Sequence, residues 1–324
     1  MPKHILILIH GITPEVMPSV HTGQYQDFWS ALQEEQPALL AVMQKIVCVE
    51  WGNKVHAVAT RPDERLSEAE LATSELVKAS HVHKHPSEQN LVHPGPLGDW
   101  NLIPGLRFVI RTLREELVQF GLADAIYYAS EEGERAVRDA VYGQVLQGLR
   151  ELRSEPEVML HVVGHSLGVT VAHDFLYGLF GKPSMPHFLS QASSQQDRDD
   201  YAFWREKAQA NQLLLGSFTS MASQLPLFAL RKQSLVDQLA KGEKLDPAAI
   251  GIVPNGQTQW LIVYDVDDPL GFATRELYGD RPEVRQVQVD AGDTPIKAHT
   301  AYWKNKLVIR EAAQLIATRA GAAY

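Results

Sequence analysis

The most constraining feature of the sequence is an apolar run that ends in a serine between two glycines. Residues 158–163 read Val-Met-Leu-His-Val-Val, and Gly164 and His165 then lead to Ser166, with Gly168 two residues beyond it. A short apolar run of this kind is typical of a buried strand. Glycine two residues before and after the serine permits a turn too tight for a side chain at either position. The pattern predicts that Ser166 lies on a sharp turn between a strand and a helix, whose N-terminus favours negative charge on a nearby oxygen.

Short apolar runs alternate with helical patterns along the rest of the chain. The expected strands are residues 5–9, 45–51, 158–163, 212–220, 259–264 and 284–289. The expected helices are residues 24–43, 135–153, 167–181 and 301–319. This alternation is typical of a mostly parallel sheet with helices on both faces. The chain has 324 residues and 45% hydrophobic content, so we predict a single α/β domain over residues 1–324, with insertions.

The charge balance argues against two classes of partner. With 39 acidic and 30 basic residues, the net charge is −9, and no basic block interrupts the mixture. Phosphate contacts are made largely by clustered Lys and Arg, so a nucleic acid or an anionic membrane surface is disfavoured. The apolar run 5–9 is too short to span a membrane, and no small-residue cleavage site follows it. We therefore expect no transmembrane segment and a cytoplasmic location.

The chain contains one cysteine, Cys48, inside an apolar run. A single cysteine cannot form an intramolecular disulfide, and its scarcity is consistent with a reducing compartment. We expect Cys48 to be buried as a small hydrophobic residue rather than to be reactive.

A serine becomes a nucleophile when a base accepts its proton and an acid orients that base. For a serine on a turn of this type, the acid and then the histidine follow along the chain. The histidines beyond Ser166 are His173, His187 and His299. His173 lies two turns along the next helix, and His187 falls in a polar stretch beside a proline. His299 follows the last expected strand and precedes the final helix, so we predict that it is the base.

Three aspartates compete for the role of the acid. The strand 259–264 runs into Asp265, Asp267 and Asp268. Asp265 follows the strand directly, whereas the other two lie in the turn. Pro269 favours an extended backbone at Asp268, which projects its side chain outward. We favour Asp268 as the acid and keep Asp265 and Asp267 as alternatives; capping of the next helix is the other use for aspartates here.

An attacked carbonyl becomes an oxyanion, whose charge needs preorganised donors. One expected donor is the backbone N–H of Leu167, directly after the serine. The second should come from the loop after the first strand, where the sequence reads His-Gly-Ile. We predict that the backbone amide of Gly11 or Ile12 is this second donor.

These residues together resemble the α/β-hydrolase superfamily of serine hydrolases over almost the whole chain. The pieces that resemble it are residues 5–11, residues 164–168, Asp268 and His299, and the finer pattern over 164–176 is similar to esterases, lipases and intracellular phospholipase-like members. The resemblance implies an α/β-hydrolase fold and hydrolysis through an acyl-serine intermediate, with no metal or organic cofactor. The chain begins at the strand before the expected oxyanion loop, without the antiparallel strands that often open this fold.

Two long segments, about 52–134 and 182–211, interrupt the alternation of strands and helices. In α/β-hydrolases such insertions form a cap over the substrate site, so the resemblance implies a cap here. Apolar residues in the first segment suit either a hydrophobic ligand or packing of the cap onto the body; they are Trp100, Leu102, Ile103, Leu106, Phe108 and Val109.

The first segment also holds a cluster of histidines: His81, His83, His85 and His93. Alternating histidines can bind a metal such as zinc. These lie among lysine, serine and proline with no cysteine or regularly spaced carboxylate nearby, so we expect a solvated loop and no metal site.

The sequence thus predicts a serine hydrolase that acts on a small-molecule carboxylic ester with an apolar acyl or alcohol part. A thioesterase, an amidase or an acyltransferase would use the same three residues. A non-catalytic binding protein of the same fold is the alternative from another class, and the complete order of serine, aspartate and histidine argues against it.

Overall fold

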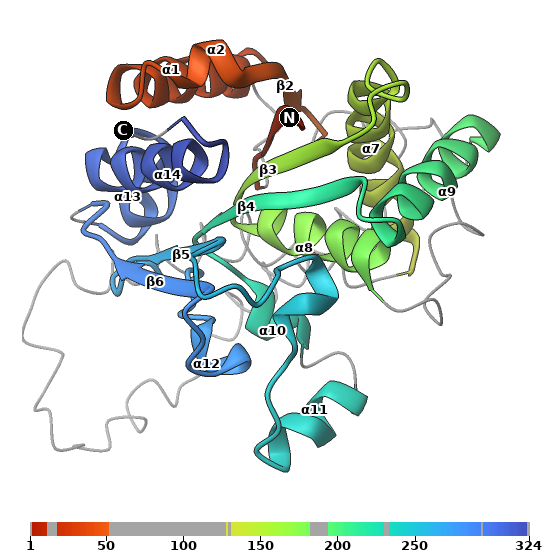
Figure 1. The fold of residues 1–324 in the computed structure, drawn as a ribbon. Helices are drawn as coiled ribbons and strands as arrows, with labels where there is room; N and C mark the ends of the chain where they lie inside the picture. The colour runs from red at the N-terminus through yellow and green to blue at the C-terminus, as the bar shows by residue number, and fades with distance from the viewer. Residues whose placement is uncertain are drawn as a thin grey trace, which may run out of the picture.

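In the described part of the chain, six parallel strands form the central sheet. The computed structural model describes residues 2–11, 18–51, 128, 131–181, 194–229, 233–292 and 294–322. The strands are β1 (Lys3–Ile9), β2 (Met43–Val49), β3 (Val158–His165), β4 (Leu213–Met221), β5 (Trp260–Tyr264) and β6 (Val284–Gln288). Their order in the sheet is β2-β1-β3-β4-β5-β6, and all neighbouring pairs are parallel (Figure 1). All six strands predicted from the sequence are present, with ends shifted by at most two residues.

The strand β1 is apolar on both sides because helices cover each face of the sheet around it. In β1, Ile5, Ile7 and Ile9 belong to one buried cluster, whereas Leu6 and Leu8 belong to a second. Successive side chains of a strand point to opposite faces, so β1 contributes side chains to both hydrophobic clusters. The continuous apolar run at the start of the sequence follows from that double burial.

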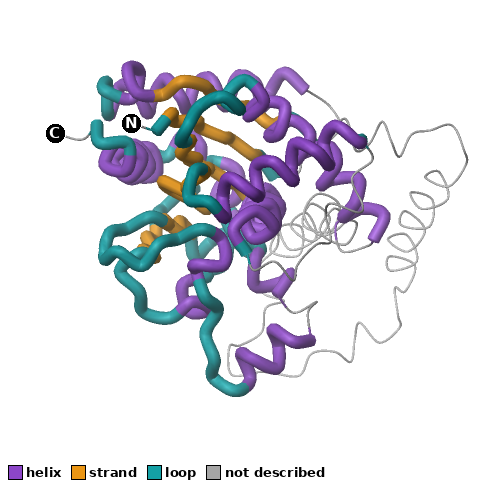
Figure 2. The backbone as a smooth tube through the Cα atoms, turned by 45° about the vertical axis from the view of Figure 1, so that its right-hand side comes forward, coloured by secondary structure: helices purple, strands orange, loops and turns teal. Residues whose placement is uncertain are grey.

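Helices form a layer on each face of the sheet (Figures 1 and 2). On one face lie α1 (Pro18–Glu35), α2 (Leu39–Val42) and α14 (Lys306–Arg319), and on the other lie α7 (Glu131–Arg150), α8 (Leu167–Phe180) and α9 (Gln195–Gln209). The shorter helical segments are α10 (Leu225–Ala229), α11 (Gln233–Ala240), η4 (Pro247–Ile250), α12 (Arg275–Tyr278), α13 (Pro295–Thr300) and η5 (Tyr302–Lys304). The described part of the chain is therefore an α/β fold with an all-parallel sheet between two helical layers.

The second expected cap segment differs from the expectation where the structure describes it. Residues 195–209 form α9, which packs against α7 and α8 with Tyr201 and Trp204 buried. The polar residues of its first turns face the end of α7, where the buried Asp200 carboxylate accepts hydrogen bonds from Arg150 and Arg153. These arginines lie just before β3 begins, so α9 covers the amino end of the sheet and not the edge that carries Ser166. The helix packs despite its polar sequence because its aspartates are paired with arginines across the interface with the end of α7.

Residues 182–193 and most of the first expected insertion, including its four clustered histidines and its apolar residues, lie outside the described residues. The helix predicted at 135–153 begins four residues earlier, at Glu131.

The expectation that Cys48 is buried is wrong. Cys48 lies in β2 and is exposed, while its neighbours Val47 and Val49 are buried in the core. β2 is one of the two edge strands of the described sheet, and the alternation along it places Cys48 on the face opposite the two valines.

A row of polar side chains crosses three neighbouring strands within the core. The Nδ1 atom of His4 lies 3.1 Å from Nε2 of His161, and Nδ1 of His161 lies 2.8 Å from Oγ of Ser217. Burial is the main cause that lowers the pKa of His161 from 6.5 to about 3, and the nearby His4 and Arg319 lower it further. The imidazole of His161 is therefore neutral in the folded protein at neutral pH.

We expect this histidine to make the fold sensitive to acid. Below pH 6.5 the unfolded chain binds a proton at His161 that the folded chain excludes until about pH 3, so the free energy of unfolding should fall by about 1 kcal/mol per pH unit across that window. His161→Gln keeps hydrogen-bonding groups but removes this titration. Urea unfolding between pH 4 and 7 should give a flatter pH profile for the variant; parallel profiles for the two proteins would refute the assignment.

Candidate functional site

Ser166 lies on the tight turn between β3 and α8 that the sequence predicts. Its backbone has φ 54° and ψ −129°, a left-handed conformation that is uncommon for a residue with a side chain. A Cβ atom at Gly164 would lie 3.1 Å from the amide nitrogen of Val169, and one at Gly168 would lie 2.6 Å from the carbonyl oxygen of Ile9. Neither position has room for a side chain, so the two glycines permit the turn and the close approach of α8 to β1.

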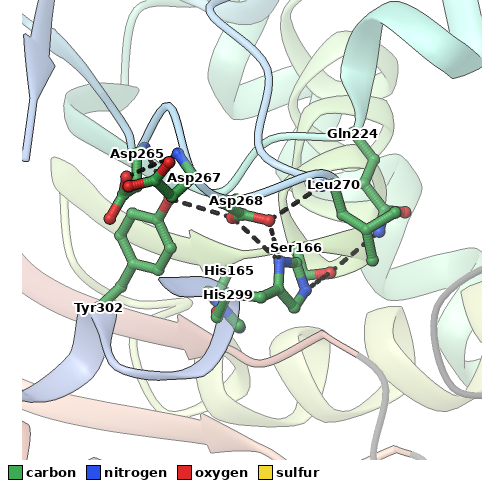
Figure 3. A network of polar contacts seen from close by, with 9 residues as sticks. All are labelled: His165, Ser166, Gln224, Asp265, Asp267, Asp268, Leu270, His299 and Tyr302. Atoms are coloured by element: carbon green, nitrogen blue, oxygen red, sulfur yellow. Dashed lines mark hydrogen bonds and ion pairs between the residues drawn. The ribbon is translucent and has the colours of Figure 1, made fainter. Parts of the chain in front are cut away.

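Three side chains from separate segments form one line of polar contacts (Figure 3). Oγ of Ser166 lies 2.9 Å from Nε2 of His299, a residue of α13. Nδ1 of the same imidazole lies 2.9 Å and 3.0 Å from the two carboxylate oxygens of Asp268, which lies in the turn after β5. The structure therefore brings together the three residues that the sequence singles out.

The structure shows different contacts for the three aspartates that the sequence offers as the acid. The Asp268 carboxylate is fully buried and faces His299. The Asp265 carboxylate instead accepts hydrogen bonds from the backbone amides of Asp267, at 2.9 Å, and Ala291, at 2.6 Å. Asp267 is exposed and has no contact with the imidazole. Asp265 thus organises the turn, and Asp268 is the aspartate that contacts the histidine.

Hydrogen bonds keep the Asp268 carboxylate charged. Burial by itself raises the pKa of this carboxyl group, but the hydrogen bonds and charge of His299, followed by the bonds from Leu270 and Tyr302, outweigh it and hold the pKa below the ordinary value. The Leu270 amide donates at 2.9 Å and the Tyr302 hydroxyl at 3.0 Å. Burial, together with the neighbouring carboxylate of Asp268, holds the pKa of Tyr302 well above its usual range, so this hydroxyl remains a donor.

The charge on Asp268 decides where the protons of the line lie. A carboxylate only accepts hydrogen bonds, so Nδ1 of His299 carries a hydrogen and donates it to Asp268. In the neutral imidazole Nε2 is then an acceptor, and the hydroxyl of Ser166 donates its proton to it. The three residues are arranged to move the serine proton onto the imidazole.

His165 connects the turn to the helix that holds the base. Its Nε2–H group donates a hydrogen bond of 2.7 Å to the backbone carbonyl of His299. Its ring also lies against the rings of Tyr302 and Trp303. The sequence places His165 in the turn but gives no signal of this contact.

The two residues expected to supply backbone donors, Leu167 and Gly11, lie next to Ser166. Leu167 is the first residue of α8, so its N–H has no acceptor within the helix. Gly11 lies opposite the serine, because a Cβ atom there would be 3.0 Å from Oγ of Ser166. Within the described ranges, no hydrogen bond is recorded from either amide. Ile12, the other predicted donor, lies outside those ranges.

Aromatic side chains hold His10, which precedes Gly11 at the end of β1. The backbone N–H of His10 donates to the Tyr25 hydroxyl at 2.7 Å, and Nε1 of Trp51 donates to the His10 carbonyl at 3.0 Å. The His10 and Trp51 rings are stacked, with centroids 5.6 Å apart. Trp51 is buried, so it supports His10 from within the core.

A further polar residue, Gln224, contacts the serine and was not singled out in the sequence. It follows β4, is 1% exposed, and its Nε2 atom donates to Oγ of Ser166 at 3.1 Å (Figure 3). Its place just beyond a strand, at the same edge as the other site residues, is the one signal in the sequence that could have identified it.

Close packing at Gly11 leads to a prediction about stability. The Cβ atom of Gly11→Ala would lie 2.5 Å from Cβ of Ser166, so the end of β1 or the turn must move, and we expect a loss of about 1–3 kcal/mol in the free energy of unfolding. The matched control is Gly23→Ala on α1, where a Cβ atom meets nothing within 4 Å and alanine should raise stability by up to about 1 kcal/mol. Urea unfolding measures both changes; equal stability of the two variants would contradict the packing argument.

The described residues give no indication of a metal site or a membrane span. They include no group of three histidine, cysteine, aspartate or glutamate side chains placed to hold a metal ion. None of their helices is long and apolar enough to cross a bilayer. The chain matches no protein-family model, no curated protein and no solved structure. An assignment of function therefore depends on the geometry around Ser166.

Proposed function

We propose that the protein is a serine hydrolase of the α/β-hydrolase type that cleaves carboxylic esters through an acyl-serine intermediate. The observation that supports this most strongly is the continuous hydrogen-bonded line from Asp268 through His299 to Ser166. The serine and histidine are 133 positions apart in the chain, yet their polar atoms meet at 2.9 Å. A buried line of donors and acceptors in this order is the arrangement that activates a serine hydroxyl.

In the first half of the proposed reaction, the serine is acylated. Oγ of Ser166 attacks the ester carbonyl carbon while its proton passes to Nε2 of His299. The ionised Asp268 stabilises the imidazolium and holds the ring in position. The amides of Leu167 and Gly11 donate hydrogen bonds to the oxyanion. His299 then gives its proton to the departing alcohol as the bond between carbon and the alcohol oxygen breaks.

In the second half, water releases the acyl group. His299 accepts a proton from water, and the water oxygen attacks the acyl carbon. The bond from that carbon to Oγ breaks, and Oγ recovers a proton from Nε2 of His299. The products are a carboxylic acid and the free enzyme, and no step needs a group beyond these side chains, the two amides and water.

Two features support the α/β-hydrolase assignment beyond the three residues themselves. Serine, aspartate and histidine occur in the chain order of that superfamily. They also follow β3, β5 and β6 of a parallel sheet, and the serine lies on a strand-to-helix turn with a strained backbone. We further propose, as the sequence indicates, that the substrate is a small ester and that the protein acts in the cytoplasm.

The first test is covalent labelling of the serine. A fluorophosphonate probe should label the wild-type protein on Ser166, because its hydroxyl is already hydrogen bonded to the base. Ser166→Ala should abolish the label, whereas Ser154→Ala, at an exposed turn, should retain it. Mass spectrometry of the labelled peptide locates the site. A folded wild-type protein with unmodified Ser166 would exclude the proposal.

The second test separates the two aspartates of the turn. Asp268→Asn removes the charge that stabilises the imidazolium and permits the wrong tautomer, so kcat should fall by about a thousandfold or more. Asp267→Asn changes an exposed carboxylate with no contact to the imidazole and should leave kcat within about twofold.

Both variants are measured with p-nitrophenyl esters, and acyl-CoA and anilide substrates show whether the bond cleaved is an ester, a thioester or an amide. Equal losses in the two variants would remove Asp268 from the mechanism.

A further inference from the structure

Gln224 places an unsatisfied acceptor beside the proposed nucleophile. Its side chain is 1% exposed, and its Nε2 atom donates to Oγ of Ser166. The other end of the same amide, Oε1, is buried and has no hydrogen-bond partner in the part of the chain that the structure describes. Figure 3 shows the Ser166 hydroxyl between the His299 ring and the Gln224 amide.

The protons of the site determine which way this amide faces. Ser166 has one hydroxyl proton, and that proton is donated to Nε2 of His299. Oγ can therefore only accept from Gln224, so the NH₂ group faces the serine and the carbonyl Oε1 faces away. The unpartnered atom is thus an acceptor and not a donor.

A buried carbonyl without a partner is destabilising, and native proteins contain few of them. The hydrogen bond to Ser166 nevertheless holds the amide in this orientation. Such an atom at a reactive centre is explained when a bound molecule supplies the missing donor.

The stereochemistry of attack indicates which part of a substrate reaches Oε1. The tetrahedral carbon on Oγ carries an oxyanion, a leaving group and an acyl chain. In the proposed reaction the oxyanion is bound by the amides of Leu167 and Gly11, and the leaving group is protonated by Nε2 of His299. An acyl chain that leaves the tetrahedral carbon on the side of Gln224 would pass this amide, whose Nε2 atom lies 3.1 Å from Oγ.

We propose that Gln224 selects acyl groups that carry a hydroxyl on their second or third carbon, whose O–H donates to Oε1. This inference rests on the proposed function and specifies its substrate class as hydroxyacyl esters. The reach is suitable, since Oε1 lies within roughly 5 Å of Oγ, which is the 3.1 Å contact plus the width of the amide group. A hydroxyl two or three carbons along the chain spans that gap with an ordinary hydrogen bond.

The donor is a hydroxyl and not an ammonium group for electrostatic reasons. The carboxylate of the site, Asp268, contacts the far side of His299, and the group facing the acyl chain is a neutral amide. A buried cation there would lose its hydration without gaining a counter-charge, whereas a neutral hydroxyl needs only the acceptor that is present.

The experiment compares p-nitrophenyl esters of butyrate, 2-hydroxybutyrate, 3-hydroxybutyrate and 3-methoxybutyrate. The methoxy compound has no donor but fills at least as much space as the hydroxy compound. Dividing each kcat/KM by the alkaline hydrolysis rate of the same ester removes the inductive effect of the added oxygen. Wild-type protein should prefer at least one hydroxyacyl ester over butyrate by about tenfold to a hundredfold, and should show no such preference for the methoxyacyl ester.

The variants are Gln224→Met, which keeps the length of the side chain but removes both amide groups, and Gln224→Leu in case the first does not fold. Each should lower the preference to about one, whatever its effect on the overall rate. Gln209→Leu, on α9 at the amino end of the sheet, is the matched control and should keep the wild-type preference. Fluorophosphonate labelling shows that Ser166 remains reactive in every protein compared.

Labelling and butyrate hydrolysis without any hydroxyacyl preference would overturn the role of Gln224 and leave the serine hydrolase proposal standing. A preference that persists in Gln224→Met would also overturn it. Absence of labelling in folded wild-type protein would instead exclude the hydrolase itself.

Discussion

The close approach of β1 to the turn after β3 is the constraint on which the rest of the site depends. Gly168 brings the first turn of α8 against the carbonyl oxygens at the end of β1, and Gly11 itself lies against Ser166. Side chains at these positions would push the strand end and the turn apart. This packing surrounds Ser166, whose backbone is in a strained conformation.

Parallel strands explain why distant residues meet. All strands of such a sheet end at the same edge, so each following turn adds a group to one place. The contributing residues are Gly11 after β1, Ser166 after β3, Gln224 after β4, Asp268 after β5 and His299 after β6. One edge thus combines a backbone donor, a hydroxyl, an amide, a carboxylate and an imidazole without any of them being near another in the chain.

The sequence predicts the features that are marked by a local pattern of residues or by the order of residue types along the chain. Apolar runs locate the six strands, and the order of residue types singles out Ser166 and His299. The sequence does not predict contacts between distant segments that carry no such pattern. The hydrogen bond of His165 joins residues 134 positions apart, and that of Gln224 joins residues 58 positions apart. The exposure of Cys48 depends on the position of β2 at an edge of the sheet. The sequence does not predict that α9 packs against the body, because charged residues that are paired in the fold have the same sequence pattern as charged residues on a solvated surface.

The bond from His165 to the main chain of His299 has a mechanical consequence. It attaches the segment bearing the imidazole to the residue that directly precedes the serine. A displacement of α13 would therefore act on the end of β3 as well, because this hydrogen bond joins the two segments. This hydrogen bond lies outside the proton path, yet it couples the position of the base to that of the nucleophile.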